Sequence, residues 1–194
     1  MNMYILKDKK ESLIYYIKKV FANTPYPEDK ILVNINHFNN NCGDCVDTQN
    51  YFNGKRWFEL IENNKLMEES LRFLNHKAWY YFLPAYLIEN INEESFDIHQ
   101  IRIFDDFKSE NLIDSRKKLI NWQKEKFNQL NKIQIEQIIF YIELGKEYSD
   151  YVNDLGDVNL KNKLLRKLRF PRRDGDKFRY IRSLEFWKLL YDDK

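Results

Sequence analysis

Two cysteines, Cys42 and Cys45, are separated by two residues, and the chain contains no others. Thiolates at this spacing can bind zinc or cycle between a dithiol and a disulfide. A structural zinc site needs four ligands; His37 lies five residues upstream, and Asp44 or another histidine could complete the set. No second C-x-x-C pair follows, and no βαβ pattern surrounds this one. We therefore expect two half-buried thiols at a helix start, with zinc binding by Cys42, Cys45 and His37, or redox chemistry, as alternatives.

Other residue patterns offer little chemistry. His37, His76 and His99 are scattered, and the sequence has neither H-E-x-x-H nor G-x-S-x-G. Gly54-Lys55 lacks the preceding glycine and the following Ser or Thr of a phosphate-binding loop. The sequence predicts no catalytic residue, no cofactor and a protein that is not an enzyme.

Charge is unevenly distributed along a chain whose formal net charge is only +2. Residues 158–182 contain ten basic and two acidic side chains, a net of +8, and residues 86–115 contain two basic and eight acidic ones, a net of −6. Solvated helix faces would explain both segments, as would two docking surfaces of opposite sign. The candidate partner-binding residues are acidic in one segment (Glu89, Glu93, Glu94, Asp97, Asp105, Asp106) and basic in the other (Arg166, Lys167, Arg169, Arg172, Arg173).

Composition and hydrophobic periodicity indicate helices. The chain has 194 residues, 16% of them aromatic, with only five Gly and four Pro, which disfavours a turn-rich β fold or disorder. Apolar residues at spacings of three and four predict helices over residues 9–23, 44–53, 56–62, 66–74, 112–130, 132–152, 158–169 and 178–191. Asn75 is a plausible N-cap for the aromatic segment that follows it. We expect an all-α fold, with one short β-hairpin near 31–36 as an addition.

The aromatic segment from Trp79 to Tyr86 has rings and aliphatic side chains on nearly every side. Such a helix is predicted to be buried in the core rather than to form an aromatic binding platform. The expected domain organisation is a helical core over residues 1–156 with a basic helical appendage over 157–194 packed on it.

Several segments in a fixed order resemble a small bacterial family of unknown function. They are Tyr26-Pro27, Cys42-Gly43-Asp44-Cys45, Phe52-Asn53-Gly54-Lys55-Arg56-Trp57 and Tyr81-Phe82-Leu83-Pro84-Ala85-Tyr86-Leu87. The similarity covers roughly residues 10–150, and Asn75-His76 stands where the family has Ser-Pro. It implies a compact cytosolic helical domain and assigns no catalytic residue.

These observations favour a non-enzymatic protein-binding module. The specific hypothesis is an immunity protein that neutralises a cognate bacterial toxin, its acidic segment covering a basic nuclease. The alternatives are a nucleic-acid-associated accessory protein that uses the basic segment 158–182, and the zinc-binding protein described above. No signal peptide is evident, and the longest apolar run, 78–88, is about half a membrane span, so we expect a cytoplasmic protein with no membrane partner.

Overall fold

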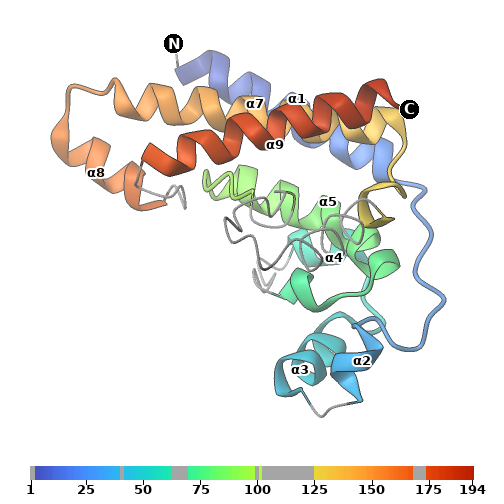
Figure 1. The fold of residues 1–194 in the computed structure, drawn as a ribbon. Helices are drawn as coiled ribbons and strands as arrows, with labels where there is room; N and C mark the ends of the chain where they lie inside the picture. The colour runs from blue at the N-terminus through green and yellow to red at the C-terminus, as the bar shows by residue number, and fades with distance from the viewer. Residues whose placement is uncertain (1–2, 40–41, 63–69, 99–100, 102–124, 168–173) are drawn as a thin grey trace, which may run out of the picture. The chain divides into compact units, whose positions relative to one another are not determined.

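The computed structural model describes the whole chain except residues 1–2, 40–41, 63–69, 99–100, 102–124 and 168–173 (Figure 1). The described residues form helices and no β-sheet, which confirms the all-α prediction. The helices are α1 (Met3–Phe21), α2 (Ile35–Phe38), α3 (Gly43–Phe52), α4 (Trp57–Glu62), the 3₁₀ helix η1 (Ser70–Phe73), α5 (His76–Asn92), α7 (Lys132–Asn153), α8 (Val158–Lys167) and α9 (Asp174–Asp192).

The chain folds into two compact units, each assembled from separate stretches of sequence. Unit 1 contains Met1–Ala22, Leu87–Ile103 and Asn131–Lys194, and unit 2 contains Asn23–Tyr86 and Phe104–Leu130. The C-terminal residues belong to unit 1 because α9 packs along α7 and buries Trp187 completely. Sequence periodicity could not give this division, because unit 1 is assembled from three separate stretches of chain.

In unit 1, α7 lies between α1 and α9, and neighbouring helices run in opposite directions (Figure 1). The Gln134 side chain donates to the Val20 carbonyl oxygen at 3.3 Å, and Lys9 pairs with Glu147, so the end of α1 meets the start of α7. Helix α7 begins with a capping box, in which Asn131 and Gln134 each accept from the backbone N–H of the other. This reciprocal pairing satisfies backbone donors that the first helical turn leaves open.

A tight turn after α5 packs beneath α7 in unit 1. Glu94 and Phe96 have φ of 57° and 44°, left-handed values that are uncommon for residues other than glycine. The Glu94 carboxylate accepts from Lys10 and from the Tyr148 hydroxyl, both at 2.6 Å, and Phe96 is buried against Gly145. Burial and the neighbouring Glu94 raise the pKa of Tyr148, which therefore stays a neutral donor. These contacts hold the turn in its strained conformation.

Unit 2 is built around the first part of α5. Asn75 caps this helix, as predicted, because its Oδ1 accepts from the backbone N–H of Ala78 at 2.9 Å. Trp79, Phe82 and Tyr86 are all buried, which confirms that the aromatic segment belongs to the core. Pro84 lies within α5.

The suggested hairpin near 31–36 is not formed. Within the described residues, extended pairing here is limited to one antiparallel bridge between Val33 and Leu74, and α2 begins at Ile35. The Asn34 N–H donates to the Phe73 carbonyl at 2.9 Å and the Asn75 N–H to the Leu32 carbonyl at 2.7 Å. The alternating residues therefore pair with a distant segment instead of folding back on themselves.

Among the residues that the structure describes, no helix is both long enough and apolar enough to cross a membrane.

Candidate partner-binding groove

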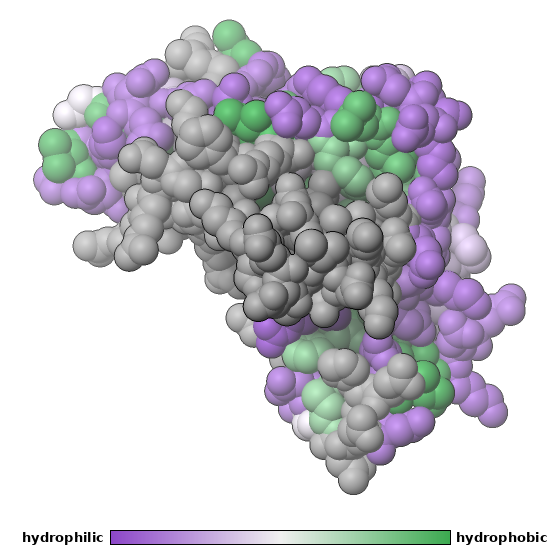
Figure 2. Space-filling model, viewed as in Figure 1, coloured by the Kyte–Doolittle hydropathy of each residue, from purple (hydrophilic) through white to green (hydrophobic). Residues whose placement is uncertain are grey.

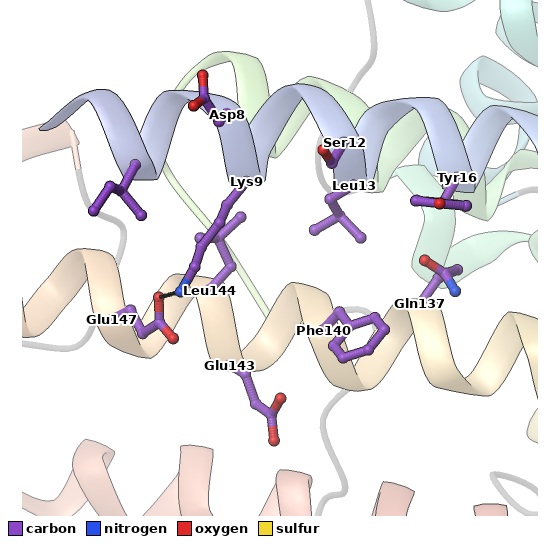
Figure 3. A pocket seen from close by; sticks show the side chains of 11 residues that line it. Asp8, Lys9, Ser12, Leu13, Tyr16, Gln137, Phe140, Glu143, Leu144 and Glu147 are labelled. Atoms are coloured by element: carbon purple, nitrogen blue, oxygen red, sulfur yellow. Dashed lines mark hydrogen bonds and ion pairs between the residues drawn. The ribbon is translucent and has the colours of Figure 1, made fainter. Parts of the chain in front are cut away.

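A groove of about 520 Å³ lies between α1 and α7 in unit 1 (Figure 3). Six of its lining residues come from α1 and five from α7. They are Ile5, Asp8, Lys9, Ser12, Leu13 and Tyr16 on α1, and Gln137, Phe140, Glu143, Leu144 and Glu147 on α7.

The spacing of these residues explains why they share one groove. On α1, positions 5, 9, 12 and 16 are separated by four, three and four residues, and on α7, positions 137, 140, 144 and 147 by three, four and three. An average step of 3.5 residues keeps side chains on one side of a helix, as in the seam of a coiled coil. Both helices therefore direct such a stripe toward the groove that separates them.

Apolar groups line the groove at two depths. Leu13 and Leu144 are buried and form its floor, while Ile5, Tyr16 and Phe140 remain 51%, 49% and 48% exposed. On the face drawn in Figure 2, most of the coloured surface is hydrophilic and the hydrophobic areas are small and separate. Large apolar side chains gathered along one groove differ from scattered ones, because contiguous apolar surface is typical of interaction sites.

Charged groups border this apolar surface. Lys9 extends across the groove to Glu147, with 2.6 Å between Nζ and Oε2 (Figure 3). Glu143 points away from α1 and pairs with Lys188 of α9 at 3.0 Å. The described residues show no ion-pair partner for Asp8. With three carboxylates and one ammonium group, the lining has a formal charge of −2.

A second, smaller groove of about 350 Å³ runs between α7 and α9. It is lined by Ile142, Lys146, Ile181, Leu184, Glu185 and Lys188. The ion pair between Glu143 and Lys188 therefore joins the borders of the two grooves.

The acidic candidates from the sequence are not gathered in this groove. Glu93 is exposed, whereas Glu89, Glu94 and Asp97 are half-buried. Glu94 is used internally, because Lys10 and Tyr148 donate to its two carboxylate oxygens. Asp105 and Asp106 lie outside the described residues, so docking through the segment 86–115 stays a prediction.

The basic candidates are only partly described. Arg166 and Lys167 belong to the last turn of α8, and Arg169, Arg172 and Arg173 lie outside the described residues. The nucleic-acid alternative therefore also stays a prediction.

The two cysteines lie where the sequence predicted, at the start of α3. Cys42 is the N-cap residue and is half-buried, while Cys45 is fully buried. Burial, then its contact with Cys42, raises the pKa of the Cys45 thiol to about 11, so this thiol is protonated at neutral pH. His37 belongs to α2 and His76 to α5, and His99 lies outside the described residues. Within the described part of the chain, no three His, Cys, Asp or Glu residues are grouped as metal ligands.

A buried lysine is a further unusual feature, in unit 2. Lys126 is almost fully buried, and its Nζ lies 4.3 Å from the centre of the Trp79 ring. Burial lowers the pKa of Lys126 to about 7, and burial followed by the charge of Lys126 lowers the pKa of His76. The contact with the face of the Trp79 ring offsets part of the free-energy cost of removing the ammonium group from water.

The groove residues were missed because the sequence analysis followed only the stripes that face the core. On α7 that stripe runs through Ile135, Ile138, Ile139 and Ile142. Ile133 and Phe140 fall outside it, and both are exposed. Large apolar residues on the second face of a helix were the available signal.

Comparison with known proteins identifies a family for this chain but no function. No curated protein and no solved structure matches it. The model of a family of unknown function, DUF6714, matches residues 9–166, which include most of α1, all of α7 and both cysteines. The chain therefore belongs to the DUF6714 family.

Proposed function

We propose that this protein is a non-enzymatic protein-binding module whose docking site is the groove between α1 and α7. The observation that carries the proposal is the half-exposure of Ile5, Tyr16 and Phe140 above the buried Leu13 and Leu144. Removing apolar side chains from water contributes about 25 cal/mol for each Å², and the entropy lost on association offsets part of this gain. Aromatic residues set in a groove with a charged border are also the kind that dominate binding energy at protein interfaces.

The chemistry of the lining supports binding rather than catalysis. Lys9 and Glu147 neutralise each other, as do Glu143 and Lys188. The other polar side chains are Asp8, a hydroxyl and an amide. These groups can set the orientation and selectivity of a partner without taking part in a reaction.

Photo-crosslinking in the native host tests this proposal. Tyr16→p-benzoylphenylalanine places a reactive ketone in the groove, and Phe58→p-benzoylphenylalanine places it on α4 of unit 2. Phe58 is a matched control because it is 43% exposed, against 49% for Tyr16. We expect a discrete adduct from position 16, identified by mass spectrometry, which disappears when Phe140→Lys is added. The same adducts at both positions, or none at position 16, would contradict the proposal.

The immunity hypothesis is a specific form of this proposal. A basic toxin suits a groove bordered by the carboxylate of Asp8, although this residue lies outside the acidic segment expected from the sequence. Co-expression with the product of the neighbouring gene tests it. We expect a stable complex that protects the host and that Phe140→Lys disrupts. An equally toxic gene product with and without this chain would refute the immunity form and leave the docking proposal standing.

A further inference from the structure

We infer that the occupant of the groove is an amphipathic helix of another protein, with basic residues beside its apolar stripe. The inference rests on the proposed docking function and goes beyond it by naming the secondary structure and the charge of the partner.

The shape of the groove favours a helix. Helices α1 and α7 are antiparallel neighbours, and each directs a stripe with alternating steps of three and four residues toward the groove. Two helices arranged in this way form the holes into which the side chains of a third helix can pack. From Ile5 to Tyr16 the rise along α1 is about 16 Å, which accommodates about three turns of a bound helix.

The apolar residues fit the stripe of such a helix. Tyr16 and Phe140 stand on opposite walls of the groove (Figure 3), and Ile5 lines it about three turns before Tyr16 on α1. A helix laid along the groove would cover all three with apolar residues at positions i, i+3 or i+4, i+7 and i+11, which span about three turns. Between them, the exposed Ser12 provides a polar group that penalises a wholly apolar partner.

The border charges favour a basic partner. Lys9 is paired with Glu147 and Glu143 with Lys188, so the negative charge left at the border of the groove for a bound helix is that of Asp8. The same charge disfavours a second copy of this chain, because pairing groove with groove would bring two Asp8 carboxylates into one interface. A basic helix from another protein is therefore a better fit than self-association.

Selection from a displayed library tests the inference with the full-length protein. The library presents 18-residue helical peptides with varied apolar stripe positions and with Lys, Glu or Gln at the flanking positions. We expect the selected peptides to be amphipathic and enriched in Lys at the flanks. Their affinity, measured by fluorescence anisotropy, should fall at least about tenfold with Phe140→Lys and should not change with Phe58→Lys. It should also fall several-fold between about 50 and 500 mM salt, because exposed charges are screened.

Charge reversal supplies the second arm. Asp8→Lys combined with Glu143→Lys should shift the selection toward Glu-flanked peptides. Groove-dependent binders that are acidic, or that bind without forming a helix, would overturn the inference and leave the docking function in place. A library that yields no binder sensitive to Phe140→Lys would count against the docking function itself. A concentration-dependent dimer that Phe140→Lys dissociates would assign the groove to a second copy and overturn the inference.

Discussion

The first part of α5 in unit 2 and the α1–α7 pair in unit 1 use aromatic residues in opposite ways. In unit 2, Trp79, Phe82 and Tyr86 are buried, and Phe82 packs with its ring centre 4.5 Å from that of Phe52. In unit 1, Tyr16 and Phe140 remain half-exposed on a groove. Both regions carry aromatic residues on helices, so the presence or absence of covering elements separates the buried rings of unit 2 from the half-exposed rings of the groove.

The comparison also extends to charge. In unit 2 the buried Lys126 lies against Trp79, whereas the charges of the groove are exposed and form ion pairs between helices. A buried charge costs stability, whereas exposed pairs contribute little and are free to select a partner. Polar groups of unit 2 should therefore affect folding, and those of the groove should affect binding.

The largest expected effect comes from one substitution made in both regions. Phe82→Ala should lower the free energy of unfolding by about 3–5 kcal/mol, because it leaves a cavity in the core. Phe140→Ala should cost about 1 kcal/mol or less, because half of that side chain is already in water. Urea denaturation of the two variants measures the difference. Equal losses would show that Phe140 belongs to a core and not to a binding surface.

The next effect concerns Lys126. Its pKa is about 7 in the folded protein and 10.5 without burial, so above pH 7 the unfolded chain binds more protons and stability rises with pH up to about 10.5. Each unit by which burial lowers the pKa of Lys126 corresponds to roughly 1.4 kcal/mol of lost stability, and the contact with Trp79 offsets part of this loss. Lys126→Met should therefore stabilise the protein by about 2–3 kcal/mol at pH 7. That gain should be largest at pH 7 and below, and should shrink as the pH approaches 10.5.

Lys132 of α7 provides the matched control for this substitution, since it is exposed and its Nζ also lies over an aromatic ring, 4.4 Å from the centre of Tyr191. Lys132→Met should produce no gain that depends on pH. Denaturation curves recorded between pH 6 and pH 10 test both variants. A constant gain for Lys126→Met across this range would contradict the explanation based on burial.

A smaller effect is expected where α7 meets the strained turn. A Cβ on Gly145 would lie 2.9 Å from the Cβ of Phe96, whose φ of 44° leaves its backbone little room to shift. Gly145→Ala should therefore cost about 1–2 kcal/mol, although alanine normally stabilises a helix. Gly43→Ala, at a position where a Cβ meets nothing within 4 Å, should be neutral or slightly stabilising. Thermal melts compare the two, and a stabilising Gly145→Ala would refute the tight contact.

The smallest difference is expected between substitutions of the two capping asparagines. Asn131→Ala should cost about 1 kcal/mol, which is typical for the loss of an N-cap. Asn75→Ala should cost about 2 kcal/mol, because its side chain also donates to the Ile31 carbonyl at 2.9 Å and so ties α5 to the extended segment of unit 2. Chemical denaturation resolves the difference, and the reverse order would show that the Ile31 contact contributes nothing.

Local features of the fold were predictable, because they depend on neighbouring residues. Asn75 was identified as a cap, and α7 was expected over 132–152 and runs over Lys132–Asn153. The end of α3 was also predictable, because a glycine follows the helix. In the structure this residue, Gly54, has a φ of 73°, a left-handed value that glycine adopts readily. The pairing of Val33 with Leu74 was not predictable, because the two residues are 41 positions apart and the local sequence of neither segment identifies its partner.

The candidate groove also combines features set by neighbouring residues with features set by contacts between distant segments. The sequence by itself determined the helices, the caps, the apolar stripes and the uneven distribution of charge, because each follows from residue type and local spacing. Only the tertiary structure decided that Glu94 is used inside unit 1 and that α9 belongs to the same unit as α1. It also decided which apolar residues stay exposed, because exposure is set by the elements that pack nearby. Tyr16 and Phe140 became candidates for binding for this reason, while Trp79 and Phe82 became core.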